Sequence, residues 1–155
     1  MSFLVKKIYP YKSKNNPMKG CYCLIIHLND SKTIRVGKLG KIEFQKGYYI
    51  YVGSAMNGLE SRLKRHLSDS KKLHWHVDYL LKNAEIADII YNVDQKVECE
   101  ISQCISAKAD GVEGFGCSDC ECESHLYHFK SKTEAVECIE EAYDSIDMPC
   151  DFYTI

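Results

Sequence analysis

Residues 47–67 read GYYIYVGSAMNGLESRLKRHL. Residues 48–52 are aromatic or β-branched, which favours an extended, half-buried backbone, and Gly53 ends that run. Gly58 breaks the chain, and leucines then recur every fourth residue, as they do on one face of a helix: Leu59, Leu63 and Leu67. The stretch therefore predicts a strand followed by a helix.

Two basic side chains lie along one edge of the predicted helix. A rotation of about 100° per residue places Arg62 and His66 side by side, next to the leucine stripe. A cation at that position borders a cleft instead of pointing straight into solvent.

The rest of the chain predicts further strands and helices around this pair. Besides residues 48–52, the expected strands cover residues 20–28, 33–36, 41–44, 86–93 and 125–129, with an edge strand within 3–9. The expected helices cover residues 59–67, 73–84, 97–105 and 131–143, the last one beginning at a capping box. We expect an α+β fold: a small central mixed or antiparallel sheet flanked by helices, with an inserted hairpin and a C-terminal helix.

Length and composition suit one compact domain, because 45% of the 155 residues are hydrophobic. We expect a basic N-terminal arm over residues 1–19, a main domain over 20–130 and a helical extension over 131–155 that packs on it. The sequence has no apolar run long enough to cross a membrane, and its first residues lack the apolar segment of a signal peptide. We expect a cytoplasmic protein with no membrane partner.

Charge is distributed unevenly along the chain. Residues 1–72 carry 15 Lys or Arg against four acidic residues, a balance of +11, whereas the other 83 residues carry 5 against 18, a balance of -13. This asymmetry favours a basic face that neutralises phosphates and an acidic face behind it, although ordinary solvated surfaces would give the same counts.

The nine cysteines are an odd number, so a disulfide framework is not expected. Five of them lie among apolar residues, where cysteine acts as a small buried hydrophobe: Cys21, Cys23, Cys99, Cys104 and Cys138.

Two short motifs carry a resemblance to a known family. Gly20-Cys21-Tyr22 precedes Tyr51-Val52-Gly53, which is followed by Arg62. This order resembles the signature of GIY-YIG endonucleases, and the later blocks KLHWHVDYLL and GCSDCECESHL make residues 18–129 similar to the small Uri-type branch. The 31 positions between Gly20 and Tyr51 exceed the usual spacing, so the hairpin is interpreted as an insertion of this branch.

The resemblance implies a metal-dependent endonuclease that hydrolyses DNA phosphodiester bonds in repair or in processing of branched or damaged DNA. Arg62 would stabilise the charged transition state, because a guanidinium grips two phosphate oxygens. Tyr22 and Tyr51 match the signature tyrosines; one would deprotonate water and the other would order the site, and Tyr22 is the preferred base. His66 would position the nucleophile or contact phosphate.

The resemblance also implies one Mg²⁺ or Mn²⁺ ion held by a glutamate of the helix that follows the third core strand. Glu98 and Glu100 are both candidates, on opposite edges of the apolar stripe of that helix. Glu98 is preferred, but the sequence leaves the choice open.

Several polar residues near the arginine helix are candidate DNA contacts. The basic ones are Lys64, Arg65, Lys71 and Lys72. On a regular helix His74 and Asp78 share a face, and His76 points away from them. We therefore expect His74 and Asp78 to support or contact the substrate.

The block around residue 120 supplies a possible zinc site. Cys117, Cys120, Cys122 and His125 offer three thiols and an imidazole within nine positions. Structural zinc sites usually draw ligands from well-separated segments, and four ligands this close would be cramped, so zinc is the less favoured cofactor. Three alternatives remain open: an active nuclease, which would rely on a protein partner for specificity; an inactive nucleic-acid-binding module; and a zinc-stabilised interaction domain.

Overall fold

The computed structural model describes residues 18–117 and 120–155. Five strands form one sheet in the order β6-β4-β1-β5-β7, and every neighbouring pair is antiparallel. They are β1 (Gly20–Leu28), β4 (Gly47–Ala55), β5 (Glu85–Tyr91), β6 (Leu126–Phe129) and β7 (Asp151–Phe152). The expected α+β fold is confirmed, with an antiparallel sheet.

The predicted hairpin is present as a separate two-stranded sheet. It consists of β2 (Lys32–Arg35) and β3 (Lys41–Phe44), joined by the short 3-10 turn η1 (Gly37–Leu39). It lies between β1 and β4 in sequence, so these two long strands are free to pair along their full length, from Gly20 opposite Ala55 to Leu28 opposite Gly47.

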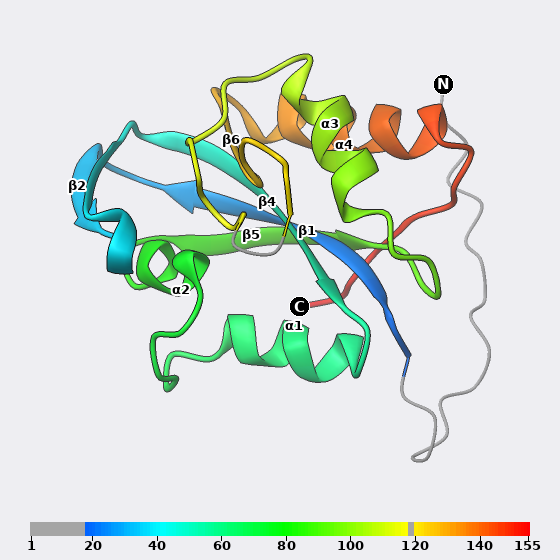
Figure 1. Ribbon diagram of the computed structural model, residues 1–155, viewed down its shortest axis with the longest axis horizontal. Helices are drawn as coiled ribbons and strands as arrows, with labels where there is room; N and C mark the ends of the chain where they lie inside the picture. The colour runs from blue at the N-terminus through cyan, green and yellow to red at the C-terminus, as the bar shows by residue number, and fades with distance from the viewer. Residues whose placement is uncertain (1–17, 118–119) are drawn as a thin grey trace.

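Four helices cover the two faces of the large sheet. The helices α1 (Leu59–Leu67) and α2 (His76–Leu81) lie on one face, and α3 (Glu98–Ser106) and α4 (Lys132–Ser145) lie on the other (Figure 1). The C-terminal helix α4 begins at Ser131, whose side chain accepts a hydrogen bond from the backbone N–H of Glu134, as the capping pattern predicts.

Burial on both faces explains the continuous apolar sequence of β1. Tyr22, Leu24 and Ile26 point into the core beneath α1 and α2, whereas Cys23 and Ile25 point into the core beneath α3 and α4. Since successive strand residues face opposite sides, a strand covered on both sides needs apolar residues at nearly every position.

Two elements differ from the sequence-based expectation. The helix expected over residues 73–84 is confined to α2, because the carboxylate of Asp78 accepts the backbone N–H groups of His74 and Trp75 and keeps those residues outside the helix. Strand β7 was not predicted; it pairs only Ile90 with Phe152 and Tyr91 with Asp151, a segment too short to show a periodic pattern.

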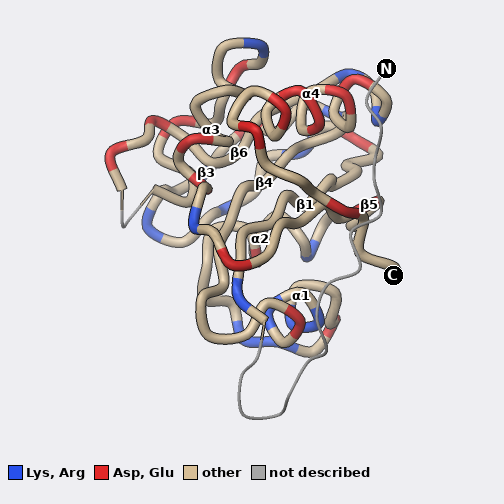
Figure 2. Tube along the Cα trace, turned by 90° about the vertical axis from the view of Figure 1, so that its right-hand side faces the viewer, with Lys and Arg blue, Asp and Glu red and all other residues tan. Residues whose placement is uncertain are grey.

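Helices of opposite charge lie on opposite faces of the sheet. Basic residues are concentrated on α1 and acidic residues along α4 (Figure 2). Within the described residues, no helix is both long and apolar enough to cross a bilayer. The edge strand expected within residues 3–9, and most of the expected basic arm, lie outside the described part of the chain.

Candidate functional site

A cavity of about 220 Å³ collects four of the predicted catalytic side chains from four different elements. Tyr22 comes from β1, Tyr51 from β4, Arg62 from α1 and Glu98 from the first turn of α3. Glu100, the alternative metal ligand, is exposed and is not among the residues that line the cavity.

A signature glycine makes room for the first tyrosine. Gly53 lies directly opposite Tyr22 in the β1–β4 register. A Cβ atom added to Gly53 would lie 2.6 Å from the Tyr22 ring, far inside van der Waals contact. The glycine at this position of β4 therefore has a steric reason: it leaves room for the end of the Tyr22 side chain.

Tyr22 and His66 form a buried pair beside the cavity. The Tyr22 hydroxyl lies 2.7 Å from Nε2 of His66, and both residues are almost fully buried. Burial lowers the pKa of His66 to about 3, with cations of α1 and Lys71 adding to the effect. Burial also raises the pKa of Tyr22, which Arg62 only partly offsets. A neutral imidazole thus faces a protonated phenol.

Tyr51 lies against this pair. Its ring centroid is 6.4 Å from that of Tyr22 and 6.2 Å from that of His66. Tyr51 is buried, which raises its pKa well above the usual value for a phenol. Tyr49, on the same strand face, donates its hydroxyl to the Gln45 carbonyl instead and does not line the cavity.

Arg62 is held at the cavity wall by two contacts. One guanidinium nitrogen donates to the Ser54 carbonyl at 3.1 Å, and its Cζ lies 4.3 Å from the centre of the Trp75 ring. Neither contact neutralises the guanidinium, so its positive charge remains directed at the cavity.

Glu98 is the single carboxylate among the described residues that line the cavity. Its Oε1 accepts a hydrogen bond from the Ser54 hydroxyl at 3.0 Å, and Lys96 Nζ lies 3.8 Å from the same oxygen. A half-buried carboxylate with one weak ion pair can bind a small divalent cation that keeps most of its water shell. The donor set therefore fits Mg²⁺ or Mn²⁺.

Arg65 and Asp78, predicted as DNA contacts, are paired with each other. Arg65 donates two hydrogen bonds to the Asp78 carboxylate, at 3.0 and 3.1 Å, and lies 4.1 Å from the centre of the Trp75 ring. Asp78 is fully buried, so of the two expected roles, contacting the substrate or supporting the site, its burial agrees only with the supporting one. Burial alone would raise the pKa of Asp78. Hydrogen bonds from Arg65 and from the backbone amides of His74 and Trp75, together with the Arg65 charge, outweigh burial and lower this pKa, so Asp78 remains ionised.

The histidines beside Trp75 are arranged differently from a regular helix. His74 is exposed and lines the cavity, and His76, expected to point away, lines it as well. His76 Nδ1 accepts the backbone N–H of Gly116 at 2.8 Å and so joins α2 to the loop before β6. The start of α2 at His76, after an extended Trp75, explains the difference.

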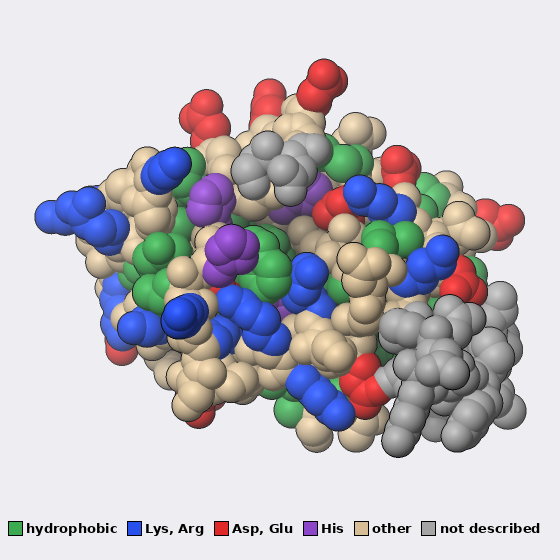
Figure 3. All heavy atoms as spheres, turned by 60° about the horizontal axis from the view of Figure 1, so that its bottom comes forward, with side chains coloured by type: hydrophobic (Ala, Val, Ile, Leu, Met, Phe, Trp, Pro, Cys, Tyr) green, Lys and Arg blue, Asp and Glu red, His purple; other side chains and the backbone are tan. Residues whose placement is uncertain are grey.

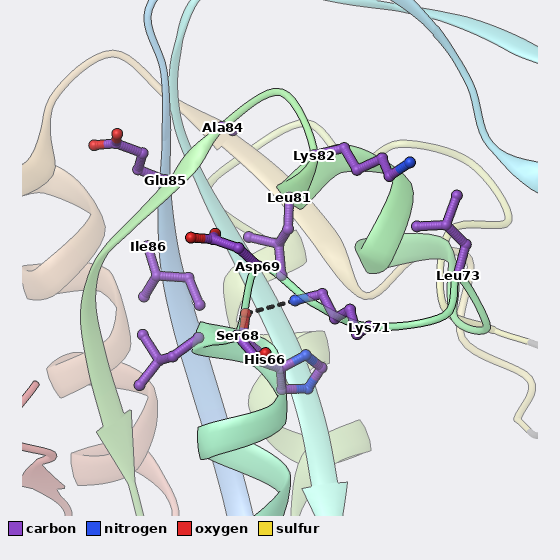
Figure 4. A pocket seen from close by; sticks show the side chains of 11 residues that line it. His66, Ser68, Asp69, Lys71, Leu73, Leu81, Lys82, Ala84, Glu85 and Ile86 are labelled. Atoms are coloured by element: carbon purple, nitrogen blue, oxygen red, sulfur yellow. Dashed lines mark hydrogen bonds between the residues drawn. The ribbon is translucent and has the colours of Figure 1, made fainter.

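The remaining predicted DNA contacts lie outside the cavity. Lys64 is exposed and forms an ion pair with Glu60 at 3.4 Å, and Lys72 is exposed. Lys71 Nζ donates to the His66 carbonyl at 2.6 Å and so caps the end of α1, within a second cavity of about 410 Å³ (Figure 4). Lysine, arginine and histidine side chains gather on this face of the molecule (Figure 3).

A second cluster of possible metal ligands lies beside the first cavity. The ligand atoms of Cys99, Cys120, Cys122 and His125 all lie within 4.8 Å of one another. Cys99 had been expected to act as a buried hydrophobe, and Cys117 had been expected in the cluster. The Cys117 thiol instead donates to the Phe115 carbonyl at 3.3 Å. The four residues together could hold a metal ion.

The profile of a family described as a domain of unknown function, DUF123, matches residues 21–148. The chain belongs to the DUF123 family. The match includes every residue that lines the smaller cavity. No curated protein and no solved structure matches this DUF123 chain.

Sequence reasoning missed two important residues of this DUF123 domain. The Trp75 ring contacts the guanidinium groups of both Arg62 and Arg65, and Cys99 completes the thiol cluster. The single tryptophan of the chain, flanked by histidines near a basic helix, was an available signal for the first. Cys99 had no local signal, because its partners come 21 or more residues later in the chain.

Proposed function

We propose that this DUF123 chain is a metal-dependent endonuclease of the GIY-YIG type, close to the Uri-type branch, that hydrolyses phosphodiester bonds of DNA. The observation that carries the proposal is the convergence of Tyr22, Tyr51, Arg62 and Glu98 on one cavity. These residues are up to 76 positions apart in the sequence, so ordinary helix or strand periodicity would not bring them together.

The first step needs a base for the attacking water. The water proton would pass to the Tyr22 oxygen as the phenol proton passes to Nε2 of His66, 2.7 Å away. The low pKa of His66 opposes this transfer in the free protein. The negative charge of a phosphate bound nearby favours the imidazolium and would make His66 a better acceptor.

The second requirement is stabilisation of negative charge on the phosphoryl oxygens. Arg62 provides a permanent planar cation at the cavity wall, and Tyr51 packs behind Tyr22 and His66 and keeps them in place. Glu98 would hold one Mg²⁺ or Mn²⁺ ion, which when bound supplies positive charge for the phosphate and the leaving oxygen.

The basic face around the cavity would bind the DNA backbone. Lys64, Lys72 and His74 are exposed there and are available to phosphates. Roles in DNA repair or in the processing of branched or damaged DNA follow from the resemblance to Uri-type enzymes. In these roles a protein partner would supply specificity.

The test is cleavage of labelled single-stranded, duplex, flap and branched DNA with Mg²⁺ or Mn²⁺. We expect Glu98→Gln and Arg62→Ala each to reduce the cleavage rate by about 10²-fold or more, because the first weakens binding of the metal ion and the second removes a cation that stabilises the transition state. The matched controls are Glu100→Gln on α3 and Ser61→Ala on α1, whose exposed side chains lie outside the cavity. They should retain cleavage within a few-fold.

The results separate an active nuclease from a nucleic-acid-binding module. Equal loss of activity in Glu98→Gln and Glu100→Gln would contradict the assignment of the metal ligand. DNA binding without cleavage of any substrate, and weakened by Arg62→Ala, would instead indicate a nucleic-acid-binding module. Because circular dichroism spectra of all variants can be compared with that of the native chain, unfolding is not confused with loss of function.

A further inference from the structure

Three thiols and one imidazole meet beside the proposed active site in an arrangement that suits a metal. The ligand atoms of Cys99, Cys120, Cys122 and His125 lie within 4.8 Å of one another, and the Cys120 sulfur is 2.9 Å from Nε2 of His125. A tetrahedron with zinc–sulfur bonds of about 2.3 Å has neighbouring ligand atoms about 3.8 Å apart. Small shifts therefore produce zinc geometry: the Cys120–His125 pair lengthens, and any pair near the 4.8 Å limit shortens.

The four ligands come from two separately supported segments. Cys99 is in the first turn of α3, and the other three belong to the loop that leads into β6, 21 to 26 residues later. His125 is anchored by its backbone, since its N–H donates to the Phe115 carbonyl and its carbonyl accepts the Val52 N–H of β4, both at 2.9 Å. Structural zinc sites take their ligands from separate segments of the chain that the surrounding structure holds in place.

Burial distinguishes these thiols from the cysteines that fill the core. Cys21, Cys23 and Cys138 are buried among apolar side chains, whereas Cys99, Cys120 and Cys122 are only half-buried and face one another. A small hydrophobe has no reason to be grouped in this way with a histidine. Thiolate sulfur and imidazole nitrogen are ligands that zinc prefers, and Mg²⁺ prefers oxygen.

We propose that Cys99, Cys120, Cys122 and His125 form a closed, four-coordinate structural zinc site. Four protein ligands leave no open position for water or substrate, so this ion holds structure and does not catalyse. It fastens the loop before β6 to the start of α3. This site is distinct from the Mg²⁺ or Mn²⁺ position at Glu98.

The zinc site would also support the proposed nuclease cavity. Cys120 and His125 themselves line that cavity, and Glu98 directly precedes Cys99 on α3. Zinc would therefore fix the cavity wall and the position of the Glu98 carboxylate. This consequence rests on the proposed function, but zinc binding itself does not.

The first test is the metal content of the full chain, purified without chelator and measured by native and inductively coupled plasma mass spectrometry. We expect one zinc ion per chain. Cys99→Ser should no longer bind stoichiometric zinc, and its zinc affinity should fall by at least about 100-fold. Removal of a metal ligand weakens binding more than removal of a residue that only hydrogen-bonds to a ligand. Cys117→Ser is the matched control and should retain the ion, because its thiol lies outside the cluster.

Alkylation of the native chain keeps the test valid if Cys99→Ser fails to fold. In excess Mg²⁺, a zinc-selective chelator should expose Cys99, Cys120 and Cys122 to a thiol reagent and leave the labelling of Cys104, whose thiol contacts Ser145, unchanged. Three results would each overturn the proposal. They are a native chain without zinc, a disulfide within the cluster, and loss of zinc in Cys117→Ser but not in Cys99→Ser. Since zinc content is measured without DNA, an inactive protein with bound zinc would contradict only the proposed nuclease.

Discussion

At the scale of single residues, His66 shows how burial sets the chemistry of the site. Its imidazole contacts the Tyr22 hydroxyl, and its ring lies among two other aromatic rings, Tyr51 and Trp75. Removal from water opposes the charged form, so the folded protein keeps His66 neutral far below the pH at which an exposed histidine takes up a proton.

This burial predicts a specific dependence of stability on pH. The folded pKa of His66 is about 3, whereas an unfolded histidine has a pKa of about 6.5. Between these values the unfolded chain binds one proton more, so the free energy of unfolding falls as the pH is lowered, by up to about 1.4 kcal/mol per pH unit. Urea unfolding at about pH 5 and about pH 6.5 measures the effect.

The variant His66→Gln isolates the contribution of this residue. Burial lowers the pKa of His76 and His125 as well, so part of the pH dependence belongs to them. We expect the loss of stability between the two pH values to be smaller in His66→Gln than in the native chain. An unchanged loss would show that the His66 imidazole is not protected from protons.

At the scale of elements, α1 and α2 are joined through one ion pair rather than through a broad helix interface. The exposed fraction of the Asp78 side chain is 0%, and that of Arg65 is 29%. Asp78 also caps the start of α2 and Arg65 supports the ring of Trp75, on which Arg62 lies. The link therefore determines both where α2 begins and where Arg62 is held.

Breaking that link should be costly. Arg65→Ala leaves the Asp78 carboxylate buried without its cation, and we expect a loss of about 3 kcal/mol in the free energy of unfolding, measured by urea denaturation. Lys64→Ala, one position earlier on α1, removes only an exposed ion pair and should change stability by less than about 1 kcal/mol. Similar effects of the two variants would contradict the structural role of the Arg65–Asp78 pair.

At the scale of the whole molecule, the central sheet is stable only because both faces are covered. Five residues of α4 are buried against the face of the sheet that carries Ile25, Ile50 and Ile90: Ala135, Cys138, Ile139, Ala142 and Tyr143. The hydroxyl of Tyr143 also donates to Asn92 at 2.7 Å. Residues 131–155 thus share one core with residues 20–130.

Truncation after Lys130 should therefore prevent folding. Removal of α4 and β7 would expose isoleucines of three central strands to water, at a cost of about 1.5–3 kcal/mol for each large side chain, which exceeds the margin of a typical domain when several are involved. Circular dichroism and proton NMR spectra of the shortened chain measure the loss. Removal of Thr154 and Ile155 alone, both exposed, should leave a folded protein. Dispersed NMR signals from the chain ending at Lys130 would contradict this view.

Local patterns in the sequence determined the elements around which the site is built. The bounds of β1 and α1 agree with prediction, because their apolar residues follow one strand or helix period without interruption. The same patterns placed Tyr22 and Tyr51 on strands and Arg62 on a helix, whereas only the family resemblance implied that the two strands are neighbours. Local patterns could not predict strand β7, because it exists only through its pairing with β5. They could not predict the short α2 either, because the buried Asp78 carboxylate sets where that helix begins.

Only the tertiary structure decided which of several similar side chains belong to the site. It placed Glu98 in the cavity and Glu100 outside it, joined Cys99 to the thiol cluster in place of Cys117, and paired Asp78 with Arg65. The two glutamates have the same side-chain chemistry, and so do the two cysteines. What separates them is contact with residues distant in the chain, which exists only after the sheet and helices have packed.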